Sequence, residues 1–246
     1  LVRSGNSLAD DINLLFSQFT QALRPMVVAT LLPGEKFQVT EADLITLQAR
    51  LEKHYEDEAL QMIWNEILVP IFRQQGAFQH VVLPHGVEEI RAWLNAPANQ
   101  QRIQQVTELN LSGLQLKALP SEIGLFTRLQ RLNLSYNQLS SLPDYIGNLR
   151  ALTELSLTHN QLSFLPESIG NLRALSWLNL SFNQLSFLPE PVGNLLALTR
   201  LDLSYNQLSS PPDSIGNLMA LSWLNLLSNK LSSLPDSIGN VRGLSW

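Results

Sequence analysis

The second half of the chain repeats one phrase at a constant step of 23 residues, and this period constrains the fold more than any other feature. The asparagines that mark the step are Asn137, Asn160, Asn183, Asn206 and Asn229. Each copy reads LxxLxLxxNxLxxLPxxIGNL with few changes. A fixed period of this length is typical of solenoids, in which each copy is one small unit stacked on the next.

Each part of the repeat has a role that follows from its residues. In Leu132-Asn133-Leu134, alternation along an extended chain directs both leucines to one face of a short strand and Asn133 to the other. One copy cannot bury its leucines alone, so we expect neighbouring strands to stack as a parallel sheet. The asparagine after each strand offers a donor and an acceptor to unpaired backbone groups, which predicts an asparagine ladder. The LPxxIG segment suits an irregular return of the chain.

These letters resemble the leucine-rich-repeat family, and the LPxxIGNL ending resembles its 23-residue subclass. That subclass occurs in intracellular Ras-group-like proteins, plant intracellular proteins and many bacterial proteins. The resemblance covers residues 106–246, as six copies and the start of a seventh. It implies an α/β fold, a horseshoe-shaped leucine-rich-repeat solenoid with a parallel sheet on its concave side. We therefore expect a helical domain at 1–105 and the repeats at 106–246.

Some copies depart from the pattern. Leu114 occupies the ladder position of the first copy, as expected of a terminal repeat, and Pro211 replaces the leucine of one LP segment. No copy with a polar outer face closes the far end of the array. We therefore expect that the natural chain continues past Trp246 or that arrays associate end to end.

Residues 1–105 lack the period and are predicted to be all α-helical. Apolar residues recur with helical spacing in four segments, Leu8 to Leu23, Thr40 to Leu51, Glu58 to Leu68 and Val87 to Leu94. We expect Pro25 and Pro70 to end the first and third of these helices. Two interpretations stay open: a cap over the apolar edge of the first repeat, or a separate targeting or partner-binding domain.

Composition argues against several classes of function. The chain has 16 Lys and Arg against 21 Asp and Glu, a net charge of −5, and no basic run, so we expect no nucleic acid. The longest apolar run, Met26 to Leu32, is too short to span a bilayer, so we expect no membrane partner. The absence of cysteine favours a reducing compartment. We expect the cytoplasm, or the host cytosol if this is a translocated bacterial protein.

No catalytic or metal-binding motif is recognisable. The sequence lacks a glycine-rich phosphate loop, an HExxH motif, a GxSxG elbow and an EF-hand loop. Only His80 and His85 lie close together, without cysteine or paired carboxylates nearby. We therefore predict a non-enzymatic chain with no metal and no cofactor. Two alternatives are the substrate-recognition part of a larger enzyme or bacterial effector, and a structural spacer.

The letters that change between copies fall on the solvent face of the predicted sheet. Trp, Tyr and Arg dominate the binding energies of protein interfaces, so this face is the candidate site for a protein partner. Its predicted residues are Arg131, Tyr136, Glu154, His159, Trp177, Phe182, Arg200, Asp202, Tyr205 and Trp223. Arg200 is expected to stack between Trp177 and Trp223. The alternatives are that the rings only pack on one another and that Glu108, Arg131 and Glu154 only pair among themselves.

Overall fold

The computed structural model describes residues 41–74 and 83–244 of the 246-residue chain. Two compact units divide the chain, Leu1–Leu47 and Gln48–Trp246. Of the first unit, the described part is the beginning of one helix at Glu41–Leu47. The predicted helix from Leu8 to Leu23, its stop at Pro25, and His80 lie outside the described residues.

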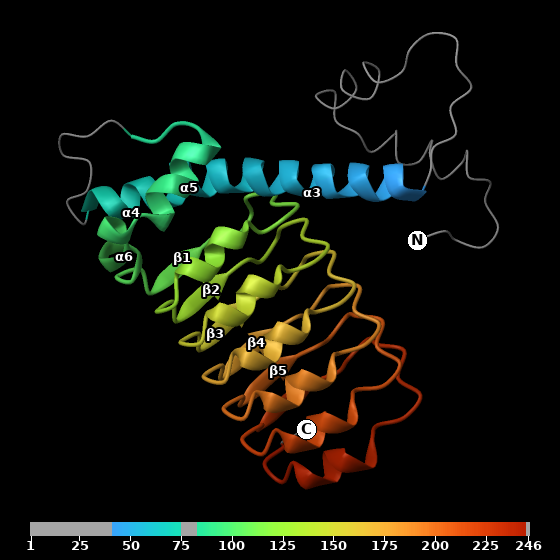
Figure 1. The fold of residues 1–246 in the computed structure, drawn as a ribbon. Helices are drawn as coiled ribbons and strands as arrows, with labels where there is room; N and C mark the ends of the chain where they lie inside the picture. Colours follow the sequence, from blue (N-terminus) through green and yellow to red (C-terminus); the bar gives the residue numbers. More distant parts are fainter. Residues whose placement is uncertain (1–40, 75–82, 245–246) are drawn as a thin grey trace, which may run out of the picture. The chain divides into compact units, whose positions relative to one another are not determined.

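Helices precede the repeats, as predicted. They are α3 (Glu41–Ile63), the π-helical turn η1 (Trp64–Leu68), α4 (Val69–Gln74), α5 (Val87–Asn95) and α6 (Pro97–Ile103) (Figure 1). Helix α5 is the fourth predicted segment. Helix α6 was not predicted, because PANQQRI has no apolar periodicity and buries only Ile103. Pro97 stands at its first turn, where its missing N–H costs no hydrogen bond.

Two predictions about these helices were wrong. The described part of the segment from Thr40 to Leu51 and the beginning of the segment from Glu58 to Leu68 belong to one continuous helix, α3, and Pro70 lies inside α4 instead of ending a helix. The π-helical turn explains how the chain tolerates this proline. Across the turn, the Val69 N–H donates to the Trp64 carbonyl oxygen. The regular α-helical hydrogen-bond pattern is therefore already interrupted where Pro70 has no N–H to donate.

Aromatic rings form the core of the helical region. The ring centroids of Trp64 and Trp93 lie 5.1 Å apart, and those of Phe72 and Trp93 lie 4.9 Å apart. The Trp64 indole N–H donates to the Pro84 carbonyl oxygen at 3.1 Å. Trp64, Phe72 and the buried leucines of the repeats belong to one contiguous apolar cluster within the second unit, and Trp93 packs against it.

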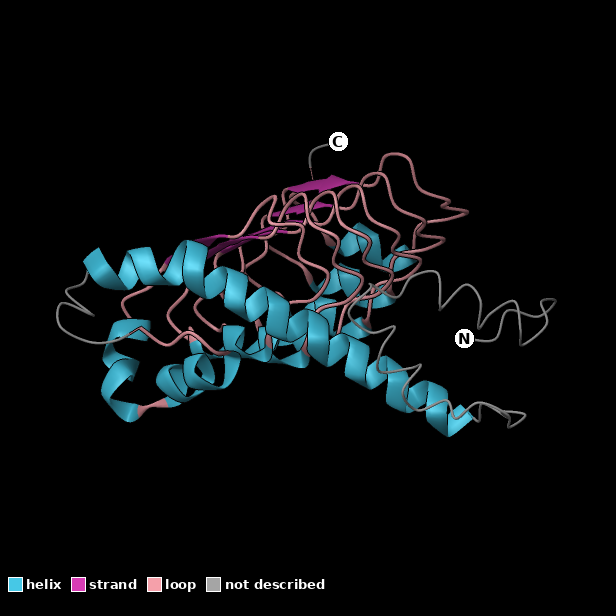
Figure 2. Cartoon of the chain, turned by 90° about the horizontal axis from the view of Figure 1, so that it is seen from above, coloured by secondary structure: helices cyan, strands magenta, loops and turns pink. Residues whose placement is uncertain are grey.

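Each repeat consists of a three-residue strand and a short 3-10 helix. The strands are β1 (Glu108–Asn110), β2 (Arg131–Asn133), β3 (Glu154–Ser156), β4 (Trp177–Asn179), β5 (Arg200–Asp202) and β6 (Trp223–Asn225). They pair in sequence order as one parallel sheet. The 3-10 helices are η2 (Ser121–Leu125), η3 (Asp144–Asn148), η4 (Glu167–Asn171), η5 (Glu190–Asn194), η6 (Asp213–Asn217) and η7 (Asp236–Asn240). Figure 2 shows the strands together on one side of the array, with the 3-10 helices on another.

The repeat chemistry is as predicted. The middle residue of every strand is a buried leucine, and Leu155, Leu178 and Leu201 are fully inaccessible to solvent. Asn183 represents the ladder: its Nδ2 donates to the carbonyl oxygens of Leu157 and Leu180 at 2.9 and 3.0 Å, and its Oδ1 accepts from the Leu162 N–H at 3.0 Å. One buried side chain therefore joins consecutive repeats.

An ion-pair hub connects the helices to the first repeat. The Arg91 guanidinium on α5 reaches Asp57 on α3 at 2.7 Å and Glu122 in η2 at 2.6 Å. Burial works to lower the pKa of Arg91, but its hydrogen bonds to Asp57 and Glu122 outweigh burial and raise the pKa above its usual range. Burial likewise works to raise the pKa of Asp57, and its hydrogen bonds to Arg91 and Lys53 lower that pKa overall. The charged forms of Arg91 and Asp57 thus stabilise each other.

Candidate binding face of the sheet

The parallel register aligns equivalent residues of all six repeats on the solvent side of the sheet, here called the strand face. Its first column contains Glu108, Arg131, Glu154, Trp177, Arg200 and Trp223. Its second column contains Asn110, Asn133, Ser156, Asn179, Asp202 and Asn225. Adjacent strands lie about 4.8 Å apart, so neighbouring members of a column can touch the same ligand.

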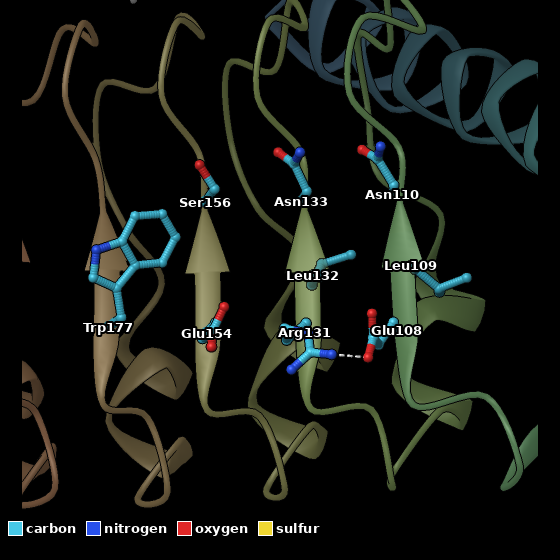
Figure 3. Close-up of a pocket in the computed structure, with 9 residues that line it drawn as sticks. All are labelled: Glu108, Leu109, Asn110, Arg131, Leu132, Asn133, Glu154, Ser156 and Trp177. Carbon is cyan, nitrogen blue, oxygen red and sulfur yellow. Dashed lines mark hydrogen bonds and ion pairs between the residues drawn. The ribbon is translucent and has the colours of Figure 1, made fainter.

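The charges of the first column are only partly paired. Arg131 forms an ion pair with Glu108 across β1 and β2, which Figure 3 draws as a dashed line. Glu154 is exposed, and within the described ranges it forms no ion pair. The expected mutual pairing of all three charges is therefore found for two of them.

The expected sandwich of Arg200 between two tryptophans is half formed. The Arg200 guanidinium carbon lies 5.4 Å from the centre of the Trp223 ring, which is cation–π distance. Among the described residues, Trp177 makes no such contact. Figure 3 shows the Trp177 ring extending from β4 toward β3, whereas Arg200 is on β5, the neighbouring strand on the other side of β4. Trp177 and Trp223 are both half-buried.

A third column runs beside the strands and consists of stacked rings. Ring centroids are 4.5 Å apart for Tyr136 and His159, 4.2 Å for His159 and Phe182, and 4.2 Å for Phe182 and Tyr205. All four residues have a left-handed backbone, with φ from 53° to 57°. The sequence predicted the column but carried no sign of this conformation, which Ser228 shares at the same position.

Asp202, a predicted binding residue, has a local structural role. Its Oδ1 accepts hydrogen bonds from the backbone N–H and the hydroxyl of Ser204, at 3.0 and 2.7 Å. Asn179 holds Ser181 in the same way. These side chains stabilise the turn that follows each strand, as Asx turns do. The second column therefore offers fewer free polar atoms than its letters suggest.

A shallow hollow of about 360 Å³ lies over β1 to β4. Its lining residues are Glu108, Leu109, Asn110, Arg131, Leu132, Asn133, Glu154, Ser156 and Trp177 (Figure 3). Ser156 is satisfied by a 2.7 Å hydrogen bond to Ser135, whereas the Glu154 carboxylate faces solvent. The sequence placed these residues on one face, but it could not predict a hollow, which depends on the three-dimensional arrangement of their side chains.

Within the described residues there is no group of three or more His, Asp or Glu side chains that could hold a metal ion. The described part of the chain also contains no helix long and apolar enough to cross a membrane. The groups with shifted pKa values are Glu56, Asp57 and Arg91, which lie in the helical region instead.

The repeats match the leucine rich repeat family over residues 104–162, 127–185 and 197–218. Among solved structures, the chain is similar to a leucine-rich-repeat protein of Leptospira interrogans, with 38% identity and a TM-score of 0.55 over 62% of this chain and 39% of that one. It is similar to the plant peptide hormone receptor RGFR1 in complex with RGF2, with 41% identity and a TM-score of 0.54 over 58% and 24%. No curated protein sequence matches the chain.

A further similar structure is the ectodomain of the plant membrane receptor kinase GASSHO1/SCHENGEN3 from Arabidopsis thaliana, in complex with CASPARIAN STRIP INTEGRITY FACTOR 2. The identity is 38% and the TM-score 0.53, over 61% of this chain and 19% of that one. The chain thus spans between 19 and 39% of the length of these three proteins. The repeats of this chain are leucine-rich repeats, and such repeats typically bind proteins or peptides and are usually not catalytic.

Proposed function

We propose that this chain is a non-catalytic module that binds an extended segment of a protein partner on the strand face. The observation that carries the proposal is the exposure of large aromatic side chains in the third column, which borders the strand face. Tyr136, Phe182 and Tyr205 are 62, 42 and 45% exposed, although each stacks on a neighbour. Two of the similar structures, RGFR1 and GASSHO1/SCHENGEN3, were solved as complexes with RGF2 and CASPARIAN STRIP INTEGRITY FACTOR 2.

Stacking among the rings accounts for only part of this arrangement. A non-glycine residue with a left-handed backbone costs on the order of 1 kcal/mol, and a stacked pair returns about 0.5–1.5 kcal/mol. Because these two contributions nearly cancel, glycine or asparagine at these positions would give the fold about the same stability as the aromatic residues do. Rings that stay exposed after stacking provide rigid apolar area for a partner at little entropic cost.

We assign the main anchors to Trp177 and Trp223, because tryptophan is enriched among interface residues with large binding energies. Arg200, resting on Trp223, is presented in one orientation and favours a carboxylate of the partner. Arg131, Tyr136, His159, Phe182 and Tyr205 are proposed to border the same contact, and Asp202 supports it through its turn.

The test is selection of binding peptides from a random displayed library on the purified chain. The Trp177→Ala, Trp223→Ala double variant should weaken the selected peptides by at least about 2 kcal/mol and keep its fold, because both rings lie outside the leucine core. The matched control is Phe164→Ala, Phe187→Ala, which removes two exposed rings outside the sheet. Equal affinity of the tryptophan variant and the wild type would refute binding on the strand face.

Three finer assignments are also proposals. We propose that the repeats belong to the LPxxIGNL subclass and that the chain works in the cytoplasm, on the support of the repeat letters and the absence of cysteine. The effector interpretation rests only on the bacterial members of that subclass.

We further propose that the helices from Gln48 to Ile103 cap the first repeat, with Arg91 as the main attachment. End-to-end association of arrays stays a prediction that sedimentation can test.

A further inference from the structure

We infer that Glu154 and Trp177 form a subsite for a cationic side chain, arginine or lysine, of the bound segment. This inference rests on the proposed function and specifies the chemistry of the partner at one point of the strand face. It depends on three observations: which charge Arg131 pairs with, which ring Arg200 stacks on, and where the hollow lies.

Arg131 is the cation that would otherwise neutralise Glu154. It lies between Glu108 and Glu154 in the first column, one strand from each. Its guanidinium pairs with Glu108, so Glu154 is an exposed carboxylate without an ion-pair partner among the described residues. A basic residue of a ligand can therefore pair with Glu154 without breaking an existing ion pair.

Trp177 provides the second half of the subsite. It is in register with Glu154 on the adjacent strand, about 4.8 Å away by strand spacing. Its other neighbour, Arg200, places its guanidinium over Trp223. A cation is attracted to the face of an indole within about 6 Å of its centre, so one guanidinium can meet both the ring and the carboxylate.

The hollow gives such a side chain room. Glu154 and Trp177 lie at one end of the hollow over β1 to β4, and the Trp177 ring extends toward β3 (Figure 3). Its charged lining consists of two carboxylates and one guanidinium. With the Glu108–Arg131 pair neutral overall, the remaining charge is negative, which selects a positive occupant.

The pairing makes Glu108 an indirect determinant of binding. In Glu108→Gln, Arg131 loses its partner and is free to pair with Glu154 from the other side. Affinity for a basic peptide should then fall. In Arg131→Gln the competing cation is gone, and affinity for the same peptide should rise. A site that only sums nearby charges predicts the same direction of change for each variant as this subsite does. The two models differ for peptides bound only over β3 and β4, because there only the re-pairing of Arg131 makes the loss of Glu108 matter.

The experiment uses the displayed-library peptides selected on the wild-type chain, resynthesised with fluorescent labels. Most should contain an arginine or lysine whose replacement weakens binding, and replacing arginine by its neutral isostere citrulline should weaken it about 3- to 10-fold. Glu154→Gln should weaken the arginine peptide by a similar factor. Glu167→Gln, an exposed carboxylate in η4 with the same change in net charge, is the matched control and should have no effect.

A double-mutant cycle decides whether the two groups meet. The citrulline peptide should bind wild type and Glu154→Gln equally, because the contact is already lost. If the arginine and citrulline peptides respond alike to Glu154→Gln, or if the selected peptides contain no required basic residue, the cationic subsite is refuted. If those peptides still depend on Trp177 and Trp223, the proposed function stands without the subsite. If no selected peptide depends on the tryptophans, both fail.

Discussion

A column of glycines in the 3-10 helices lets consecutive repeats approach closely, and Gly170→Ala tests this close approach directly. A Cβ placed on Gly170 would lie 2.5 Å from the Pro191 carbonyl oxygen and 2.6 Å from the Pro191 Cβ in the next repeat. Gly170 does not have a left-handed backbone, so its own conformation would accept alanine. The obstacle is the neighbouring repeat alone.

The size of the effect follows from these distances. Ordinary van der Waals contact begins near 3.4 Å, so η4 and η5 must separate by several tenths of an ångström or more. The atoms in the way are backbone and proline atoms, which cannot turn aside as a flexible side chain can. Overpacking of this kind costs about 1–3 kcal/mol. For a domain of this size that corresponds to a fall in melting temperature of about 2–12 °C.

Gly239 is the matched control within the same chain. It occupies the equivalent position in η7, and no described atom lies within 4 Å of a Cβ built there. Without a neighbour, replacing glycine by alanine reduces the entropy of the unfolded chain and stabilises by about 0.4–1 kcal/mol at a compatible position. Urea unfolding followed by circular dichroism should therefore give opposite signs for Gly170→Ala and Gly239→Ala. Equal stability of Gly170→Ala and wild type would refute the close approach.

Two further predictions concern polar groups. Asn183→Leu should cost about 1–3 kcal/mol in urea unfolding, because it leaves the Leu162 N–H buried without a partner, whereas the Leu157 and Leu180 carbonyl oxygens keep hydrogen bonds from Asn160 and Asn206. The absence of a measurable cost would contradict the ladder. Arg91→Met should cost about 2–4 kcal/mol at pH 7, because it leaves Glu122 buried and unpaired. The lowered pKa of Asp57 contributes stability above the ordinary Asp pKa of about 3.9 that is lost as pH falls below it. The cost of Arg91→Met should therefore shrink in acid, and a cost that grows in acid would contradict the hub.

Periodicity alone was enough to predict the repeat array. Leucines at alternate positions, an asparagine at each strand end and LPxxIG in the return are local patterns, and one unit can bury its leucines only by stacking on the next. The parallel register, the buried leucine of each strand and the asparagine ladder were all confirmed. The helices were predicted less well. The prediction that Pro70 ends a helix was wrong because the π-helical turn that accommodates this proline has no sequence signature here.

The sequence by itself placed the variable residues on one face, because side chains alternate along a strand and the repeats stack in register. Which of those residues pair with one another was decided only in the tertiary structure. Arg131 has a carboxylate on each side and pairs with Glu108, and Arg200 has an indole on each side and lies over Trp223. Equivalent neighbours cannot be ranked from sequence spacing, since the choice depends on rotamers set by the surrounding packing. That choice leaves Glu154 and Trp177 available together on one side of the sheet.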